Sequence, residues 1–381
     1  MRLIYLFIGL LPSFALGSAF TQLPKAFSVP DKRECSERLG VCEIRNMPRV
    51  ASQDGLGICY ACVAATMMQT ENCRKLNIDC SNLEKSQLIS QLDLTRIVAP
   101  QDPGRQAPMA RSAYKGLKTS PDDNVKESGG DPHSTALIAS LVTKKVASEA
   151  CVSLDVILSK MYDRKETIEA QEAMWDRMKS YYDDYRKNKE CIACTNKAYA
   201  TAIEEIDKNL DLKVSKEEVL RAFGQDTYEK FLDELTGANK CSAANMVAFE
   251  SVKTVKYEQF PDASENNPKK LKNPVTDEEF IKKMRDIVRS GRPAALSGVC
   301  LVGDPENCKG KNHAVVIAGH RKVCDREPSD PKAVCKDSVK VVNCWGQTWQ
   351  NDNNDGWVDA AALMKQTAKK PNILGWFEDK K

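Results

Sequence analysis

The sequence predicts an α+β protein in which a helical first part is followed by a large helical insertion and a β-rich last part. An apolar segment beginning near Cys59 follows a glycine-broken loop, which indicates the start of a helix. The block 151–241 is rich in charge, carries apolar residues at helical spacing and has almost no Gly or Pro. β-Branched runs at 313–319 and 338–343 indicate buried strands. With 381 residues, the chain is long enough for two or more domains.

The first 17 residues predict a secretory signal peptide. A single charge precedes an apolar run from Leu3 to Leu11, and Ala15 and Gly17 are small at the two positions that a signal peptidase reads. Cleavage after Ala19 is the alternative. The apolar run is too short to span a membrane, and no later run is long enough. We therefore expect a secreted or periplasmic protein with no membrane span.

Charge gives no reason to expect a nucleic-acid partner. The formal net charge is +3, from 56 Lys and Arg against 53 Asp and Glu, and the two signs are interspersed. The basic cluster Lys269–Lys272 is interpreted as a solvated loop.

Fifteen cysteines in an exported chain predict a disulfide framework. The number is odd, which fits one reactive thiol and up to seven bridges. The local pairs that we expect are Cys35–Cys42, Cys73–Cys80 and Cys324–Cys335, with Cys191 and Cys194 bridging outward to Cys151 and Cys241.

Cys59 is a candidate nucleophile. A thiol at a helix start lies at the positive end of the helix dipole, where the thiolate is favoured. Gln53 precedes it by six residues across two glycines, so the loop can fold back and aim the side-chain amide at a carbonyl oxygen attacked by Cys59. One short stretch thus supplies a nucleophile and an oxyanion donor.

The base that such a thiol needs must come from three histidines, His133, His313 and His320. His313 begins one predicted strand, and Asn343 lies near the end of the next, so neighbouring strands would place an amide beside the imidazole. His133 is expected on a helix and His320 in a loop, both without a catalytic role.

Three sequence blocks resemble the signature blocks of the papain-like cysteine peptidase family, in the order of that family. They are Gln53–Ala61, His313–Gly319 and Asn343–Trp349. A weaker fourth block, Ser86–Ile89 followed by Gly129–Leu137, is similar to the paired-glycine segment that lines the substrate groove. The resemblance covers roughly 50–139 and 247–376, with gaps.

This resemblance implies peptide hydrolysis through an acyl-enzyme, with no metal or organic cofactor. A Cys59 thiolate and a His313 imidazolium would form the reactive pair, and the Cys59 backbone N–H would share the oxyanion with Gln53. The residues carried over are Cys59 as nucleophile, His313 as base, Asn343 as the group orienting the imidazole, Gln53 in the oxyanion hole, Trp345 as a shield over the Asn–His bond, and Gly129 and Gly130 as the edge that pairs with the substrate.

Four departures from the family pattern lie beside these residues. They are Leu56 in place of a disulfide cysteine, Ile58 in place of a small residue, Tyr60 in place of Trp, and Cys344 in place of Ser. They affect the first disulfide and the shape of the groove, not the catalytic groups. Only Ser18–Ser52 separate the signal from the first block, which is too short for the long inhibitory propeptide of the family.

The resemblance also implies the papain-like two-lobe fold, a helical lobe and a β-rich, barrel-like lobe with the substrate between them. The expected divisions are 1–17 for the signal, 18–140 for the helical lobe, 141–245 for a disulfide-tethered helical insertion, and 246–381 for the β-rich lobe. His313 lies about 250 residues after Cys59, where about 130 to 150 are usual, and the insertion accounts for most of the excess. The expected partners are a protein or peptide substrate and a proteinaceous inhibitor, and the chain is expected to be a monomer.

The insertion allows two interpretations, a structural element without an active role or a lid or exosite at the cleft. Ser215 and Glu218 have the spacing of a capping box within it. After it, Thr276–Gly291 predicts an amphipathic helix and Arg292–Cys300 a strand. The polar run 350–356 is interpreted as a hairpin turn, since an EF-hand count from Asn351 puts Ala362 where a calcium-binding Glu belongs.

Other classes of function stay open. Cys59-Tyr-Ala-Cys62 is the Cys-x-x-Cys pattern of thiol-disulfide oxidoreductases, although no βαβ pattern surrounds it. A zinc site built from this pair with Cys191 and Cys194 is a weaker alternative. The third is a non-catalytic binding protein on a peptidase scaffold.

Overall fold

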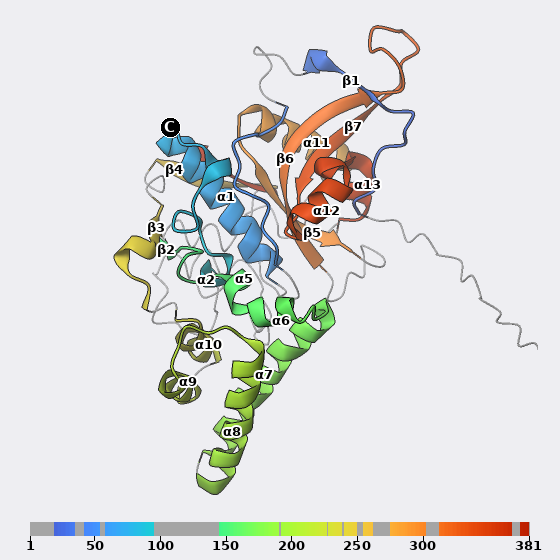
Figure 1. Cartoon of the computed structure of the whole chain (residues 1–381). Coiled ribbons are helices and arrows are strands. Elements are labelled where there is room, and N and C mark those ends of the chain that lie inside the picture. The colour runs from blue at the N-terminus through green and yellow to red at the C-terminus, as the bar shows by residue number, and fades with distance from the viewer. Residues whose placement is uncertain are drawn as a thin grey trace, which may run out of the picture.

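The computed structural model describes residues 19–34, 42–53, 58–94, 145–189, 192–226, 228–237, 240–249, 254–261, 275–301, 312–367 and 374–380. Several predictions fall outside these ranges: the signal peptide, Gly129, Gly130, His133 and the pairing partner Cys35. The described part is a mixed α+β structure with a mostly antiparallel sheet, as the sequence predicted (Figure 1).

One large sheet forms the C-terminal half. Its strands are β1 (Val29–Pro30), β4 (Val255–Phe260), β5 (Ala294–Cys300), β6 (Asn312–Cys324), β7 (Cys335–Val342), β8 (Trp357–Asp359) and β9 (Leu374–Asp379). The order is β4-β9-β5-β6-β7-β8, with β1 pairing to β6. Among the described residues β4 and β8 are not paired to each other, so the expected barrel-like closure is wrong and the sheet is open.

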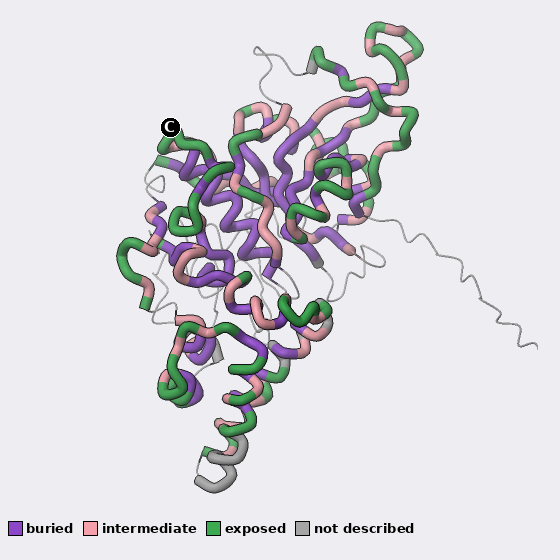
Figure 2. The backbone as a smooth tube through the Cα atoms, in the orientation of Figure 1, coloured by how far each residue is buried: buried purple, intermediate pink, exposed green. Residues whose placement is uncertain are grey.

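Helix α1 (Cys59–Leu76) packs against β6 and β5 and is the central helix of the molecule (Figure 1). Its residues from Cys59 to Cys73 are all buried, so it is enclosed on every side and not amphipathic (Figure 2). The helix ends at Asn77, whose left-handed φ of 52° is the conformation that Asn tolerates at such ends.

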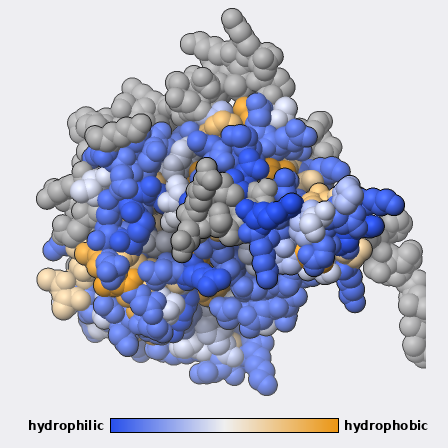
Figure 3. All heavy atoms as spheres, turned by 90° about the horizontal axis from the view of Figure 1, so that it is seen from above, coloured by the Kyte–Doolittle hydropathy of each residue, from blue (hydrophilic) through white to orange (hydrophobic). Residues whose placement is uncertain are grey.

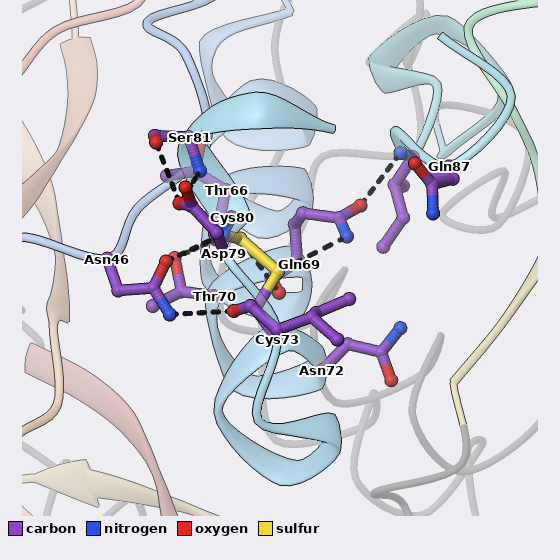
Figure 4. The surroundings of a disulfide bond; sticks show 12 residues. Asn46, Thr66, Gln69, Thr70, Asn72, Cys73, Asp79, Cys80, Ser81 and Gln87 are labelled. Atoms are coloured by element: carbon purple, nitrogen blue, oxygen red, sulfur yellow. Dashed lines mark hydrogen bonds between the residues drawn. A yellow bond between two sulfur atoms is a disulfide. The ribbon is translucent and has the colours of Figure 1, made fainter. Parts of the chain in front are cut away.

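The C-terminal end of α1 is held by the predicted Cys73–Cys80 disulfide, which is confirmed (Figure 4). Asn46 donates to the Ile78 carbonyl at 2.8 Å and accepts from the Cys80 N–H at 2.6 Å. Gln69, one turn earlier on α1, accepts from the Ile89 N–H at 3.0 Å. The incoming N-terminal segment and the outgoing loop are therefore both tied to this helix.

The predicted insertion contains α5 (Leu154–Ile157), α6 (Ser159–Asp163), α7 (Ile168–Asn188), α8 (Ile192–Asn209), α9 (Lys216–Phe223) and α10 (Tyr228–Thr236). Its two ends meet where β2 (Lys145–Ala147) pairs with β3 (Met246–Ala248). Beside this ribbon Cys151 and Cys241 are bonded to each other, so the expected bridges from Cys191 and Cys194 to these two residues are wrong. Helices α7 and α8 project away from the sheet (Figure 1).

Side-chain packing inside the insertion follows the predicted pattern. Met161, Met174, Met178 and Tyr182 are buried, so these apolar residues at helical spacing belong to the core. The capping box at the start of α9 is formed by both of its hydrogen bonds, between Ser215 and Glu218.

Three short or amphipathic helices flank the sheet, α11 (Asp277–Arg289), α12 (Gly346–Asp352) and α13 (Ala360–Lys365), and α2 (Gln91–Leu94) follows α1. The predicted helix and strand at Thr276–Gly291 and Arg292–Cys300 are confirmed as α11 and β5. The hairpin turn predicted at 350–356 is wrong, because α12 continues to Asp352 and a 3₁₀ turn, Asn354–Gly356, leads into β8.

The Cys324–Cys335 disulfide joins β6 to β7, as predicted. Cys42 is also disulfide-bonded. Where the structure is described, no helix is long and apolar enough to cross a membrane. The face seen in Figure 3 is mostly hydrophilic, with small separated apolar areas.

Candidate active site

Cys59 is the first residue of α1 and is 8% exposed. It is the free cysteine of the described residues. The backbone N–H groups of Ala314, Tyr60 and Cys59 itself act to lower the pKa of its thiol. Burial raises the pKa of this thiol, and the N–H groups offset that only in part. Burial therefore opposes the thiolate that a helix N-terminus by itself was expected to favour.

The contact with Ala314 places Cys59 against the residue that follows His313 on β6. The His313 Nε2 atom lies 2.7 Å from Oδ1 of Asn343, and the two residues are 4% and 0% exposed. Asn343 directly follows β7, and Val316 of β6 pairs with Val342 of β7, so strand register brings the histidine and the amide together.

The protonation state of His313 follows from this bond. Oδ1 of Asn343 only accepts, so Nε2 carries the hydrogen and Nδ1 is the ring nitrogen left to accept a proton. Burial lowers the pKa of His313, and the Asn343 bond offsets part of that shift. The ring is therefore neutral, in the tautomer that a general base acting on Cys59 requires.

An aromatic cluster packs against the imidazole of His313. The Trp345 ring stacks on His313, with centroids 4.9 Å apart and planes at 26°. Trp349 of α12 meets Trp345 edge-on at 5.8 Å, and Phe20 contacts both indoles and the imidazole. Trp345 is where the family resemblance expects a shield. No role was predicted for Phe20 or Trp349.

Cys62, one turn after Cys59, is bonded to Cys344, the residue after Asn343. This disulfide joins the helix of the candidate nucleophile to the segment of the candidate base pair, and the sequence analysis did not anticipate it. The signal was present, since Cys344 replaces the usual Ser within a block that must approach α1. With Cys62 so engaged, Cys59 and Cys62 form no dithiol pair, which removes the basis of the oxidoreductase alternative.

The backbone of Gln53 is bonded to the segment that follows Asn343. Its N–H donates to the Cys344 carbonyl at 2.8 Å, and its neighbour Ser52 forms a bridge with Trp345. The side chain is buried, at 7% exposure. Residues 54–57, between Gln53 and α1, lie outside the described ranges.

Gln350 of α12 is a supporting residue that sequence reasoning missed. Its Oε1 accepts from the Asn343 N–H at 3.5 Å, and its Nε2 donates to the carbonyls of Val341 and Asp355 at 2.8 and 2.9 Å. These bonds fix the backbone on both sides of Val342, and so the direction in which Asn343 points.

His320 lies on β6 and not in a loop as expected. It is 2% exposed, and its Nε2 lies 2.8 Å from Oδ1 of Asp337 on β7. The side-chain partner of His320 is therefore the carboxylate of Asp337, and not a thiol.

A cavity of about 330 Å³ lies against Cys62 and Thr66 of α1 and against Gly346. Glu149 also lines it, and burial raises the pKa of this carboxyl to about 7. The Gln91 N–H donates to Glu149 at 3.2 Å, and this bond only partly offsets the effect of burial.

Neither metal alternative gains support in the described part of the chain, where no group of three His, Cys, Asp or Glu side chains could hold an ion. In the polar run after α12, Asp355 pairs instead with Lys340.

No family model matches this chain, and no curated protein matches it. The functional argument therefore rests on the residues of the site.

Proposed function

We propose that the chain is an exported, papain-like cysteine peptidase in which Cys59 is the nucleophile and His313 its base. The observation that carries this proposal is a free thiol at a helix start beside the strand whose histidine is held by an amide. Cys59 contacts β6 at Ala314, and His313 is bonded to Asn343 at 2.7 Å. This is the nucleophile, base and orienting group that acyl transfer requires.

In the proposed reaction, the Cys59 thiol transfers its proton to Nδ1 of His313. Each charged form is disfavoured alone by burial, so the thiolate and the imidazolium form together as a pair. The thiolate attacks the scissile carbonyl carbon, and the carbonyl oxygen becomes an oxyanion held by the Gln53 amide and the Cys59 N–H.

His313 then gives its proton to the leaving amine as the carbon–nitrogen bond breaks, which leaves an acyl-enzyme on Cys59. A water molecule transfers a proton to His313 as it attacks the thioester, and the returning proton restores the thiol. Asn343 keeps the ring oriented throughout, and Trp345 keeps water away from the His–Asn bond. In the same proposal, Gly129 and Gly130 supply the backbone edge that binds the peptide.

The proposal includes a two-lobe arrangement with α1 in the helical lobe and the open sheet in the other. The Cys62–Cys344 disulfide spans the two groups of elements at the site itself. The four disulfides among the described residues fit an oxidising compartment, as export requires.

The test compares three variants of the oxidised, processed protein on an unfolded protein substrate. Cys59→Ala and His313→Ala should each lower kcat by about 10³-fold or more, because the nucleophile and base act as a unit. His320→Gln is the matched control, a buried histidine on the same strand, and should leave kcat within a few-fold. Equal activity of all three variants would sink the proposal. A wild-type protein that binds peptides without cleaving them would support the non-catalytic alternative.

A further inference from the structure

The first described residues of the chain are packed into the candidate active site. Ala19 and Phe20 are 2% and 7% exposed. The Phe20 ring meets Trp349 at 5.1 Å, Trp345 at 5.7 Å and His313 at 6.4 Å between centroids, each in an edge-to-face arrangement. Edge-to-face packing between aromatic rings favours particular ring orientations.

The segment is anchored in the sheet. The Thr21 carbonyl accepts from the Asp359 N–H at 2.8 Å, where β8 passes into α13. The chain then runs to the far end of the sheet, where Val29 pairs with Cys324, and returns along β6 to the bridge between Ser52 and Trp345. Trp345 is thus contacted on one side by Phe20 and on another by Ser52, from the two ends of one N-terminal segment.

Trp345 needs this support because it is 36% exposed, and its contact with His313 is one ring face. The indole of Trp345, directly before α12, is large and partly exposed, so it has room to rotate unless other side chains pack against its edges. Phe20 and Trp349 supply those edges. If Phe20 is removed, a cavity opens beside Trp345, and water gains access to the His313–Asn343 bond.

We propose that Phe20 is a positioning residue of the peptidase, which holds Trp345 against His313, so that the N-terminus formed by signal-peptide removal is part of the catalytic site. This inference rests on the proposed function. It gives the short segment between signal and catalytic block a role in building the site. The imidazole is the group affected, since it exchanges protons with Cys59 and with the leaving amine.

The test compares Phe20→Ala with Phe27→Ala in the processed, oxidised enzyme. Phe27 is a matched control in the same segment, with its ring 4.8 Å from the Lys336 ammonium and no ring contact to the aromatic cluster. For Phe20→Ala we expect kcat on a peptide substrate to fall about tenfold with KM changed less than twofold, and Phe27→Ala to match wild type. Phe20→Tyr, which keeps the ring, should recover most of the lost kcat.

A second readout does not depend on peptide cleavage. The rate of Cys59 alkylation by iodoacetamide at neutral pH should fall in Phe20→Ala and stay unchanged in Phe27→Ala, because the thiol depends on a well-oriented His313. If Phe20→Ala does not fold, Phe20→Leu and Phe20→Tyr replace it, and the leucine variant should be the slower of the two. An unchanged kcat and alkylation rate in a folded Phe20→Ala would overturn the inference, as would a change confined to KM. A wild-type enzyme that alkylates at Cys59 but cleaves no peptide would instead refute the proposed function, with the alkylation comparison still deciding the role of Phe20.

Discussion

Replacing both Cys62 and Cys344 with Ser should destabilise the protein far more than removing a local disulfide. This bridge joins residues 282 apart in the chain, whereas Cys73–Cys80 joins residues 7 apart. A cross-link stabilises by restricting the unfolded chain, and the effect grows with the logarithm of the loop it closes. For these two loops it amounts to about 5.6 kcal/mol and about 2.4 kcal/mol.

The longer bridge should also affect catalysis. Cys62 lies one turn from Cys59, and Cys344 follows Asn343. Loss of the bridge would free the helix of the proposed nucleophile from the segment that orients the proposed base. A shift of about 1 Å at such a site can lower the rate up to about 10²-fold. The Cys73–Cys80 disulfide lies at the opposite end of α1, where its loss should leave kcat nearly unchanged.

The assay is guanidinium unfolding of the two double-serine variants, followed by tryptophan fluorescence, with kcat measured on the same preparations. The Cys62/Cys344 variant should unfold at the lower denaturant concentration and should alone lose activity. If the two variants have the same unfolding midpoint and the same kcat, the disulfide does not hold the site together.

Three further outcomes are expected. Glu149 has a pKa of about 7 in the folded state against 4.5 when unfolded, so the folded protein binds this proton more tightly. The free energy of unfolding should therefore fall as pH rises from 4.5 through 7, by up to about 3 kcal/mol. In urea unfolding measured from pH 5 to 8, Glu149→Gln should show less of this decline than the wild type. Gly356→Ala should lower stability by about 2 kcal/mol or more and reduce kcat, since φ is +79° and a Cβ would lie 2.0 Å from the Val341 carbonyl and 2.2 Å from the Gln350 amide. N-terminal sequencing of the secreted protein should begin at Ser18, because cleavage after Ala19 would remove a buried residue and leave a charged amine on buried Phe20; a first residue of Phe20 would contradict the packing described.

The parts of the fold that the sequence predicted are those set by local chemistry. The Ser215–Glu218 capping box and the amphipathic pattern of Thr276–Gly291 predicted two of the helices, and the β-branched runs predicted β6 and β7. The expected turn at 350–356 failed because Gln350 finds bonding partners in Val341 and Asp355 that only tertiary structure supplies. Sheet closure failed for the same reason, since strand order depends on contacts distant in sequence.

The site was predictable as far as its chemistry is carried by residue types in fixed blocks. Cys59 was named from its place at a predicted helix start, and His313 and Asn343 from two neighbouring predicted strands. The structure brings the histidine and the amide into contact. The Cys62–Cys344 bond and the Phe20 contacts were not foreseen, because each joins residues hundreds of positions apart. The raised pKa of Cys59 depends on burial, which no motif records.

The most direct test of the peptidase proposal is to treat the processed, oxidised protein with an epoxide-type inhibitor of papain-like peptidases and to map the modified residue by mass spectrometry. We expect a single adduct on the sulfur of Cys59, loss of peptide hydrolysis in proportion to labelling, and no adduct when His313 is replaced by Ala. If Cys59 stays unlabelled in the folded protein, or is labelled only after reduction, the thiol is not an activated nucleophile and the account is wrong.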